Sequence, residues 1–251
     1  MGNTITPVYP AEIQGFATGM AGELFELVEE GVTGVFGKPV PIGTPGELVI
    51  TKPFPTMPVQ FWGKNGKKQY LDSYFAKYDG VWTQSDFAVI SPSTGGLLCL
   101  GRSDGVLNPS GVRFGSGEIY TVLENRFTAQ IVDAVVVGQR RPQDTDEVVV
   151  MFLLLRPGVE FTRTLVNEVK DSIAKALSKR HVPKYIFETK EIPSTINMKK
   201  VELPVNKIIS GIKISPSATL RNPECLEFYY QFVEVEKRWA EQKAVWNTSK
   251  L

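Results

Sequence analysis

The sequence predicts an α+β fold in two parts, a β-rich first part and a compact α+β module that follows it. Before about residue 100, short alternating apolar runs lie between Pro- and Gly-rich clusters, a pattern typical of β-hairpins. After it, runs with helical spacing and continuous apolar runs follow one another, which indicates helices packed on a sheet. With 251 residues and 42% hydrophobic content, the chain is long enough to bury substantial cores.

The first part is predicted to contain at least three strands. They are "GELFELVEE" (22–30), "GELVITK" (46–52) and "FAVIS" (87–91). The clusters "KPVPIGTPG" and "KPFPTMP" lie between them and supply turns, because Pro presets one backbone angle and Gly adopts angles closed to other residues. We therefore expect hairpins in this part.

The α+β module is predicted to open with a helix and two strands. Ser116 is expected as the N-cap, since its side chain can accept a backbone N–H, and apolar residues continue at helical spacing to Phe127. The two strands are expected at 131–138 and 147–155, where Val and Leu dominate.

A second helix is predicted from about Thr162 to Arg180, because apolar residues recur on one face, and a short strand at 185–193 follows it. Later, Asn222 is expected to cap a last helix with Pro223 at its first position. Strand, strand, helix, strand after a leading helix is the order of a compact α+β domain of about a hundred residues.

The composition argues against several classes of partner. With 28 basic and 27 acidic residues the net charge is +1, too small to recruit nucleic acid or a membrane surface. The longest apolar runs, such as 148–155, are too short to span a bilayer, so no membrane insertion is expected. Cys99 and Cys225 form neither a disulfide framework nor a metal cluster, which predicts a reduced compartment and no metal site.

The last three residues predict a location. Ser249, Lys250 and Leu251 form the tripeptide that an import receptor reads to carry folded proteins into peroxisomes. The alternative is a chance tail on a solvated helix end, in a cytoplasmic protein.

Several polar residues around residue 100 are candidates for a binding site. Asp86 is expected at a strand end beside a turn, where a carboxylate can accept bonds from two sugar hydroxyls or from a turn amide. Arg102 and Arg113 can fork onto a phosphate or ribose, or form surface ion pairs. Asp104 suits either a type I turn or a hinge.

Two further residues carry a charge or a titratable ring. Lys199 is expected on a polar loop, either solvated or as the cation that meets charge developing at a phosphoryl centre. His181, the only histidine, is expected to be a neutral structural residue at a helix end.

Four segments, read in order, resemble the closing motifs of the adenylate-forming acyl-CoA synthetase family. They are "GELVITKPFPTMP", "VWTQSDFAVI", "LGRSDGVLNPSGVRFGSGEIY" and "IPSTINMKKVELPV". The stretches "SKRHVP" and "NPECLEFYYQF" are most similar to the branch that activates acetoacetate. The resemblance implies a ligase in which ATP, with Mg²⁺, and a short carboxylic acid give an acyl adenylate, from which CoA then displaces AMP.

The resemblance also implies a division of the chain. Residues 1–103 would be the β-rich end of the large AMP-binding adenylation domain, and residues 104–211 the small α+β C-terminal lid domain. Residues 212–251 would be a C-terminal helix and targeting tail. The fold expected is thus a β-rich remnant of the large domain followed by the lid domain.

Nucleotide and hinge positions follow from the same motifs. Asp86 matches the aspartate that binds the ribose hydroxyls, Arg102 the arginine that contacts the nucleotide, and Arg113 the arginine near the phosphate. Asp104 matches the hinge about which the lid domain rotates between the two half-reactions.

The CoA site and the catalytic lysine follow likewise. Ser110 and Gly111 match the turn that lines the CoA tunnel. Lys199, six residues after Pro193, matches the catalytic lysine that reaches the carboxylate and the α-phosphate, and this spacing selects it over Lys200.

The sequence departs from the family pattern at Met198 and Ser85, where the family usually has glycine. It also contains no counterpart of the family's phosphate loop, since "SPSTGGLL" (91–98) has no lysine. We therefore expect this chain to be part of such a ligase, either as a truncated product or as a half that works with a separate N-terminal adenylation domain. The alternative is a non-catalytic fragment that acts as a binding or partner module.

Overall fold

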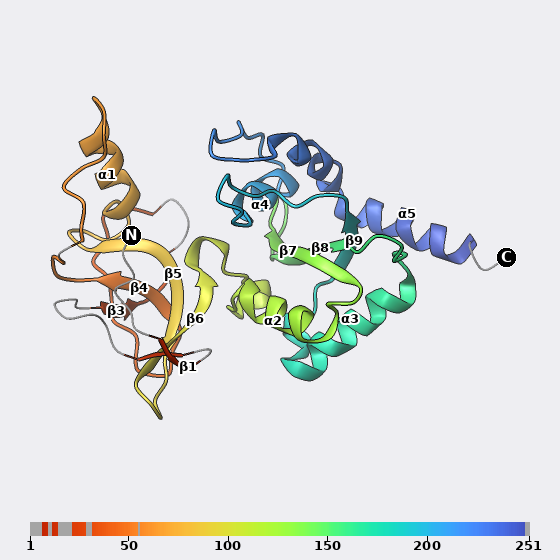
Figure 1. Cartoon of the computed structure of the whole chain (residues 1–251), viewed down its shortest axis with the longest axis horizontal. Helices are drawn as coiled ribbons and strands as arrows, with labels where there is room; N and C mark the ends of the chain where they lie inside the picture. The colour runs from red at the N-terminus through yellow and green to blue at the C-terminus, as the bar shows by residue number, and fades with distance from the viewer. Residues whose placement is uncertain (1–6, 10–11, 15–21, 29–31, 55, 249–251) are drawn as a thin grey trace. The chain divides into compact units, whose positions relative to one another are not determined.

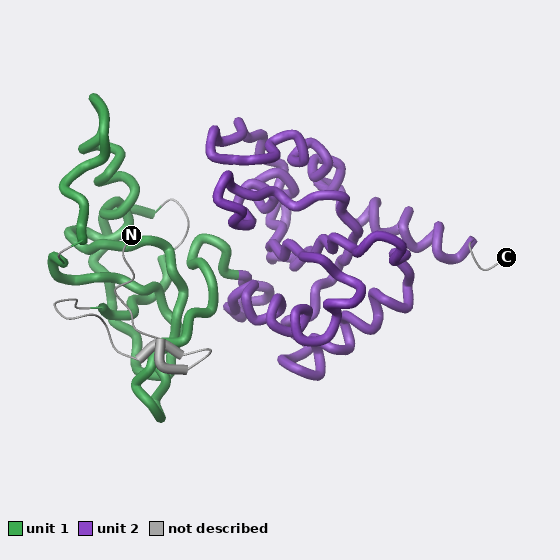
Figure 2. The backbone as a smooth tube through the Cα atoms, viewed as in Figure 1, with its two compact units in different colours: residues 1–106 green, residues 107–251 purple. Residues whose placement is uncertain are grey.

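The computed structural model describes residues 7–9, 12–14, 22–28, 32–54 and 56–248. It forms two compact units, unit 1 at residues 1–106 and unit 2 at residues 107–251, which are coloured separately in Figure 2. The predicted boundaries at residues 104 and 212 stay predictions. The targeting tripeptide at residues 249–251 lies outside the described residues.

Unit 1 is built on a sheet of antiparallel strands (Figure 1). In spatial order the strands are β1 (Pro7–Tyr9), β2 (Glu12–Gln14), β6 (Gly96–Arg102), β5 (Trp82–Ile90), β4 (Gly46–Ile50) and β3 (Gly22–Phe25). The three predicted strands appear as β3, β4 and β5. Strand β5 begins five residues before the expected run, because the aromatic and polar residues ahead of it also pair with β4.

Helix α1 (Gly66–Tyr74) was not predicted, since only hairpins were expected in this part of the chain. It is held by aromatic packing: Tyr74 stacks on Trp82 of β5 with ring centroids 3.8 Å apart, and Tyr70 is buried beside them. Its sequence, "GKKQYLDSY", has no clean apolar period, so the signal for a helix lies in contacts that form only in the folded unit.

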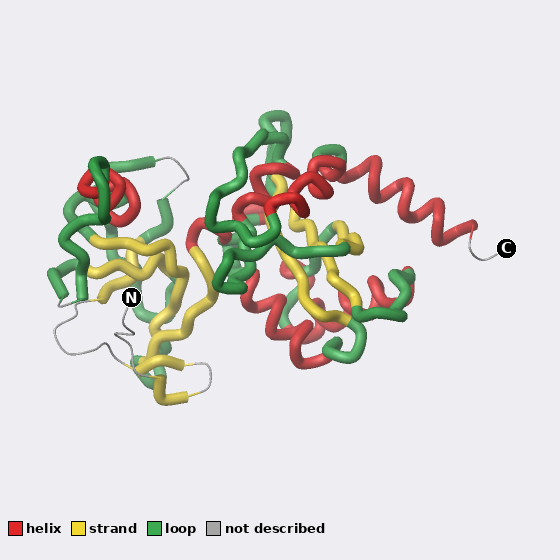
Figure 3. The backbone as a smooth tube through the Cα atoms, turned by 45° about the horizontal axis from the view of Figure 1, so that its top comes forward, coloured by secondary structure: helices red, strands yellow, loops and turns green. Residues whose placement is uncertain are grey.

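Unit 2 has a three-stranded sheet with helices on both faces (Figures 1 and 3). Strand β8 (Val148–Leu155) lies in the middle, antiparallel to β7 (Ile131–Gln139) and parallel to β9 (Tyr185–Thr189). A parallel pair needs a crossover, which α3 (Arg163–Ala176) supplies. The α+β class predicted from the sequence is confirmed.

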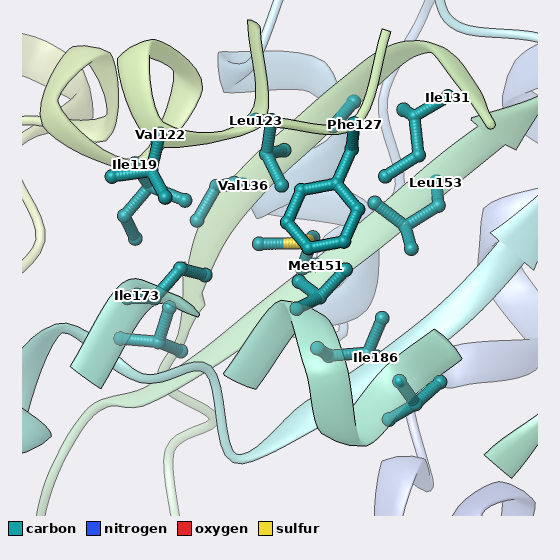
Figure 4. Close-up of a cluster of buried hydrophobic side chains, with 14 of the residues drawn as sticks. Ile119, Val122, Leu123, Phe127, Ile131, Val136, Met151, Leu153, Ile173 and Ile186 are labelled. Carbon is teal, nitrogen blue, oxygen red and sulfur yellow. The ribbon is translucent and has the colours of Figure 1, made fainter. Parts of the chain in front are cut away.

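Alternate residues of β8 enter opposite cores. Val149, Met151 and Leu153 join α3 and α2 (Ser116–Arg126) in one apolar cluster, part of which Figure 4 shows. Val150 and Phe152 join a second cluster with α4 (Leu203–Ile209) and the 3₁₀ segment η4 (Pro223–Phe232). Because side chains alternate along a strand, one apolar run serves both faces.

Two helix boundaries differ from the predictions. The N-cap position of α2 is Gly115, and Ser116 lies in the first turn with its hydroxyl donating to Glu202. Helix α3 is capped by Thr162 as expected, but it ends at Ala176 rather than Arg180. Leu177 leaves helical geometry at φ −118° and ψ −92°, although its apolar side chain continues the spacing.

The predicted last helix is an α-helix only in its second part. Pro223 begins the 3₁₀ segment η4, and α5 (Val235–Thr248) follows it. Asn222 makes no cap bond with its side chain, which instead accepts a bond from Ser194 N and donates to the Ile192 carbonyl oxygen. Among the described residues, none of these helices is both long and apolar enough to cross a membrane.

Candidate functional site

Asp86 lies inside strand β5 at an irregular step, where the pairing with β4 shifts between Leu48 and Val49. Our expectation of a strand end was wrong, because the strand resumes and continues to Ile90. The interruption is at Ser85, whose φ of 61° is left-handed. The Asp86 carboxylate is half-buried and accepts a bond from Gln84 Nε2 at 2.6 Å.

Arg102 is the cross-strand partner of Asp86, at the end of β6. Its guanidinium is engaged in a fork with Asp104, with Nε to Oδ1 at 2.8 Å and Nη2 to Oδ2 at 2.6 Å. Directly opposed residues of an antiparallel pair lie on the same face of the sheet. Unit 1 therefore brings together three predicted site residues: Asp86, Arg102 and Asp104.

Sequence reasoning missed Glu47, a fully buried carboxylate on β4. It accepts bonds from Thr83 Oγ1 at 2.7 Å and Ser103 Oγ at 2.9 Å, and it is paired with Lys77. Thr83 precedes Ser85, the residue with positive φ, by two positions, and Ser103 is next to Asp104. The hydrogen bonds to Glu47 therefore hold the backbone near Asp86 and near Asp104. The only signal for it was a glutamate within the apolar run "GELVI".

Tyr78 completes the environment of Glu47. Its hydroxyl lies 3.2 Å from Glu47 Oε2, and its side chain is fully buried. Burial first, and then the Glu47 charge, raise the pKa of Tyr78 above its ordinary value. The phenol therefore keeps its proton throughout the physiological pH range, and it can donate that proton to the Glu26 carbonyl oxygen at 2.8 Å or to Glu47.

The turn that contains Ser110 and Gly111 is anchored to the β7–β8 connection. Ser110 donates to Asp146 from its backbone N at 2.8 Å and from its hydroxyl at 2.7 Å. Asn108 N donates to Glu147 Oε1 at 2.6 Å. Bonds from Ser110 lower the pKa of Asp146, and burial raises the pKa of Glu147.

The backbone of this turn is left-handed at two successive residues, with φ 52° at Ser110 and 77° at Gly111. Arg113 follows the turn and is exposed, and no ion-pair partner is recorded for it within the described ranges. The two carboxylates thus fix the turn, while the Arg113 side chain remains open to a ligand.

Lys199 is on the second leg of a short hairpin, one residue before the isolated bridge between Ser194 and Lys200 that closes it. Thr195 N donates to the Lys199 carbonyl oxygen at 2.8 Å, and Met198 N donates to the Thr195 carbonyl oxygen at 2.8 Å. The Lys199 side chain is exposed, and the described part of the chain offers its ammonium no ion-pair partner. Lys200, in contrast, is paired with Asp133 at 2.6 Å.

The described non-glycine residues with positive φ are Ser85, Ser110 and Met198. Each lies in, or directly beside, a predicted site motif. Such conformations cost about 1–3 kcal/mol and concentrate at functional sites. Met198 and Ser85 occupy the two positions where the family pattern has glycine, so the chain keeps a left-handed backbone without the residue that favours it.

His181 makes contacts within the fold. His181 Nδ1 lies 2.8 Å from Ser178 Oγ, and its ring packs on Phe114 with centroids 4.2 Å apart. No group of three His, Cys, Asp or Glu side chains in the described ranges is arranged to hold a metal ion.

Comparison with known proteins identifies the relatives of this chain. Residues 128–199 match the family described as AMP-binding enzyme C-terminal domain. The chain is 44% identical to the acetoacetyl-CoA synthetase of Gallus gallus over 237 residues, which is 94% of this chain and 34% of that protein. It is 46% identical to the malonamoyl-CoA synthetase vrtB of Penicillium aethiopicum, over 90% of this chain and 29% of that protein.

A solved structure agrees with these relatives. The acetoacetyl-CoA synthetase from Streptomyces lividans superposes with a TM-score of 0.75 at 30% identity, over 92% of this chain and 33% of that chain. This chain is a homologue of the acetoacetyl-CoA synthetases. It spans about a third of the length of the curated relatives it matches.

The predicted resemblance to the adenylate-forming acyl-CoA synthetases is therefore confirmed, as is the fold expected for their C-terminal part. The matched C-terminal domain begins just before β7 and ends at Lys199. Arranged by unit, Asp86, Arg102 and Asp104 belong to unit 1. Ser110, Gly111, Arg113 and Lys199 belong to unit 2.

Proposed function

We propose that this chain supplies the lid domain, hinge and adenylating lysine of an acid–thiol ligase that converts acetoacetate to acetoacetyl-CoA. ATP, bound with Mg²⁺, and acetoacetate give an acyl adenylate and pyrophosphate, and CoA then displaces AMP. The observation that carries this proposal is Lys199: its exposed ammonium has no ion-pair partner within the described residues, while the ammonium of its neighbour Lys200 is bound to Asp133.

The role proposed for Lys199 follows from the charges in the first half-reaction. A carboxylate and the α-phosphate must approach one another, and negative charge concentrates where the new bond forms. A fixed ammonium between them stabilises that transition state more than it stabilises the separated reactants. A lysine whose side chain is exposed on a short hairpin is suited to enter and leave such a site.

Asp86, Arg102 and Arg113 are proposed to bind the nucleotide. The Asp86 carboxylate can accept both ribose hydroxyls, while the guanidinium groups of Arg102 and Arg113 suit ribose or phosphate oxygens. To contact the nucleotide, the Arg102 guanidinium would break its two hydrogen bonds with the Asp104 carboxylate. Breaking them costs little, because side chains exposed by 58% and 33% form only a weak ion pair.

Asp104 is proposed as the hinge, and Ser110 with Gly111 as the turn that lines the CoA path. Residues Ser103–Gly105 form a single 3₁₀ turn between extended residues on either side, so few backbone angles need to change for a rotation. Asp146 holds the 109–111 turn in place through its bonds with Ser110, so that the backbone of the turn can contact a ligand.

The proposal is tested by acetoacetate-dependent release of pyrophosphate from ATP. The purified chain is assayed alone and with a separately expressed N-terminal adenylation domain, in the wild-type, Lys199→Ala and Lys190→Ala forms. We expect turnover with the added domain, its loss in Lys199→Ala and its retention in the exposed control Lys190→Ala. No turnover by the folded wild-type chain in either arm would favour the alternative, a non-catalytic binding or partner module.

We also propose peroxisomal delivery through Ser249, Lys250 and Leu251, which the import receptor would read at a free C-terminus. A fluorescent protein fused ahead of this chain should collect in peroxisomes and should lose that location when Leu251 is deleted. Cytoplasmic fluorescence from the intact fusion would contradict this assignment.

A further inference from the structure

The ammonium of Lys200 is engaged on several sides within unit 2. Its Nζ donates to Asp133 Oδ1 and to the Ala134 carbonyl oxygen, both at 2.6 Å. It also lies 3.7 Å from the centroid of the Tyr120 ring. A carboxylate, a carbonyl and an aromatic face each stabilise an ammonium, so Lys200 is fixed where β7 and α2 meet.

A second contact secures the chain two residues later. Glu202 accepts a bond from Ser116 Oγ at 2.8 Å and another from the Tyr120 hydroxyl. The Tyr120 oxygen in turn accepts a bond from Val136 N at 2.9 Å. Burial, followed by the Glu202 charge, raises the pKa of Tyr120, so its hydroxyl remains a donor to Glu202 at physiological pH.

The other leg of the Lys199 hairpin is held separately. Ser194 N donates to Asn222 Oδ1 at 2.9 Å, and Ile196 N donates to the Thr219 carbonyl oxygen at 3.0 Å. These bonds do not involve Lys200. The hairpin therefore has two anchored legs, and the anchor of its second leg is the contact set of Lys200 and Glu202.

We propose that Lys200 is a positioning residue, which clamps the second leg of the hairpin to β7 and α2 so that Lys199 projects from a fixed base. This inference rests on the proposed function of Lys199. The two adjacent lysines then have different roles: the ammonium of Lys200 binds groups within the fold, and that of Lys199 binds the substrate. Both the charge of Lys200 and its reach are needed, because its partners include the Asp133 carboxylate on β7 and the Tyr120 ring on α2.

Hydrogen exchange of the purified chain tests the clamp without any enzymatic assay. The backbone amides of residues 195–199 are followed in the wild type, in Lys200→Met and in Lys200→Arg, with Lys190→Met as an exposed control. We expect Lys200→Met to speed exchange by about 5- to 30-fold, the effect of losing one such contact on an opening equilibrium. Lys200→Arg should restore most of the protection, and the control should change nothing. Unchanged exchange in Lys200→Met would overturn the proposal.

Asp133→Asn gives a second route to the same result, since it removes the charge partner and leaves Lys200 in place. Its effect on exchange should not add to that of Lys200→Met in the double variant, because both break one interaction. Fully additive effects would overturn the pairing on which the clamp depends.

Kinetics distinguish positioning from a general structural role. With the N-terminal adenylation domain added, Lys200→Met should lower kcat for adenylate formation while KM for ATP stays close to that of the wild type, and Lys200→Arg should recover kcat. A change in KM for ATP alone would overturn the positioning role. If the wild-type assembly itself does not turn over, the proposed function fails, and hydrogen exchange then decides the clamp by itself.

Discussion

At the scale of single residues, the site motifs contain residues with a strained, left-handed backbone, and those of unit 1 also contain the buried carboxylate of Glu47. Ser85, Ser110 and Met198 adopt left-handed angles that the sequence alone did not indicate, although the resemblance predicted glycine at two of these positions. Asp86 and Lys199 could be selected from the sequence, because their types fit the chemistry. Glu47 could not, since its partners come from residues about 30 to 56 positions away and meet only in the folded sheet.

Met198→Gly should stabilise unit 2 by up to about 1 kcal/mol. Glycine removes the penalty of a left-handed backbone, which is about 1–2 kcal/mol, and loses part of this gain to a more flexible unfolded chain. The Met198 side chain is 70% exposed, so little packing is lost. Urea unfolding measures the difference, and Met198→Ala, which keeps the strain, should show no gain. Equal stabilities of the two variants would contradict the assignment of strain.

Glu47→Gln should destabilise unit 1 by about 3 kcal/mol, because it leaves Lys77 and three hydroxyl donors facing an uncharged amide. Chemical denaturation monitored by tryptophan fluorescence checks this, because Trp82 is buried in the same unit. Glu23→Gln, an exposed carboxylate bound to Thr51, is the matched control and should cost under about 0.5 kcal/mol.

At the scale of elements, the strands of unit 2 were predicted to within about one or two residues at most ends, since continuous apolar runs in the sequence are a direct consequence of burial on two faces. Helices were predicted less well. The apolar spacing that runs past Ala176 to Leu177 extended α3 too far, and the aromatic residues of α1 gave no helical period. The 3₁₀ segment η4 packs in the second core, and no feature of its sequence distinguished it from an α-helix.

Thr162→Ala should lower the free energy of unfolding of unit 2 by about 1 kcal/mol, because it removes the side-chain cap that accepts Leu165 N at 3.2 Å. Thermal and urea unfolding measure the loss. Thr164→Ala, two residues along in the exposed first turn, is the control and should be neutral or slightly stabilising. A loss of the same size in the control would show that the cap bond is not the cause.

At the scale of the whole molecule, the chain forms two units with separate cores, as its change in pattern near residue 100 suggested. Contacts between distant segments inside each unit were beyond sequence reasoning. One such contact joins the β7–β8 connection to α5 through Arg141, which binds Asp144 and Glu236. The contribution of this contact to the stability of unit 2 depends on both carboxylates being ionised.

The Arg141 contacts predict a pH dependence. Hydrogen bonds from Arg141 hold the pKa values of Asp144 and Glu236 below their ordinary values of 3.8 and 4.5. A depressed pKa gives stability that is fully present above the ordinary value and is lost as the pH falls through the lowered value. Unit 2 should therefore be more stable in the wild type than in Arg141→Met at pH 7, and the difference should shrink below about pH 4. A difference that is constant with pH would contradict the ion-pair account.

The most direct test of the central claim, that Lys199 is the adenylating lysine of an acetoacetate-activating ligase, separates the two half-reactions in a single variant. With the N-terminal adenylation domain supplied, Lys199→Ala should lower acetoacetate-dependent exchange between ATP and pyrophosphate by about 10²–10³-fold, the usual effect of removing one transition-state contact. The same variant should still form acetoacetyl-CoA from preformed acetoacetyl adenylate and CoA. Unchanged exchange in Lys199→Ala, beside an active wild type, would contradict the claim.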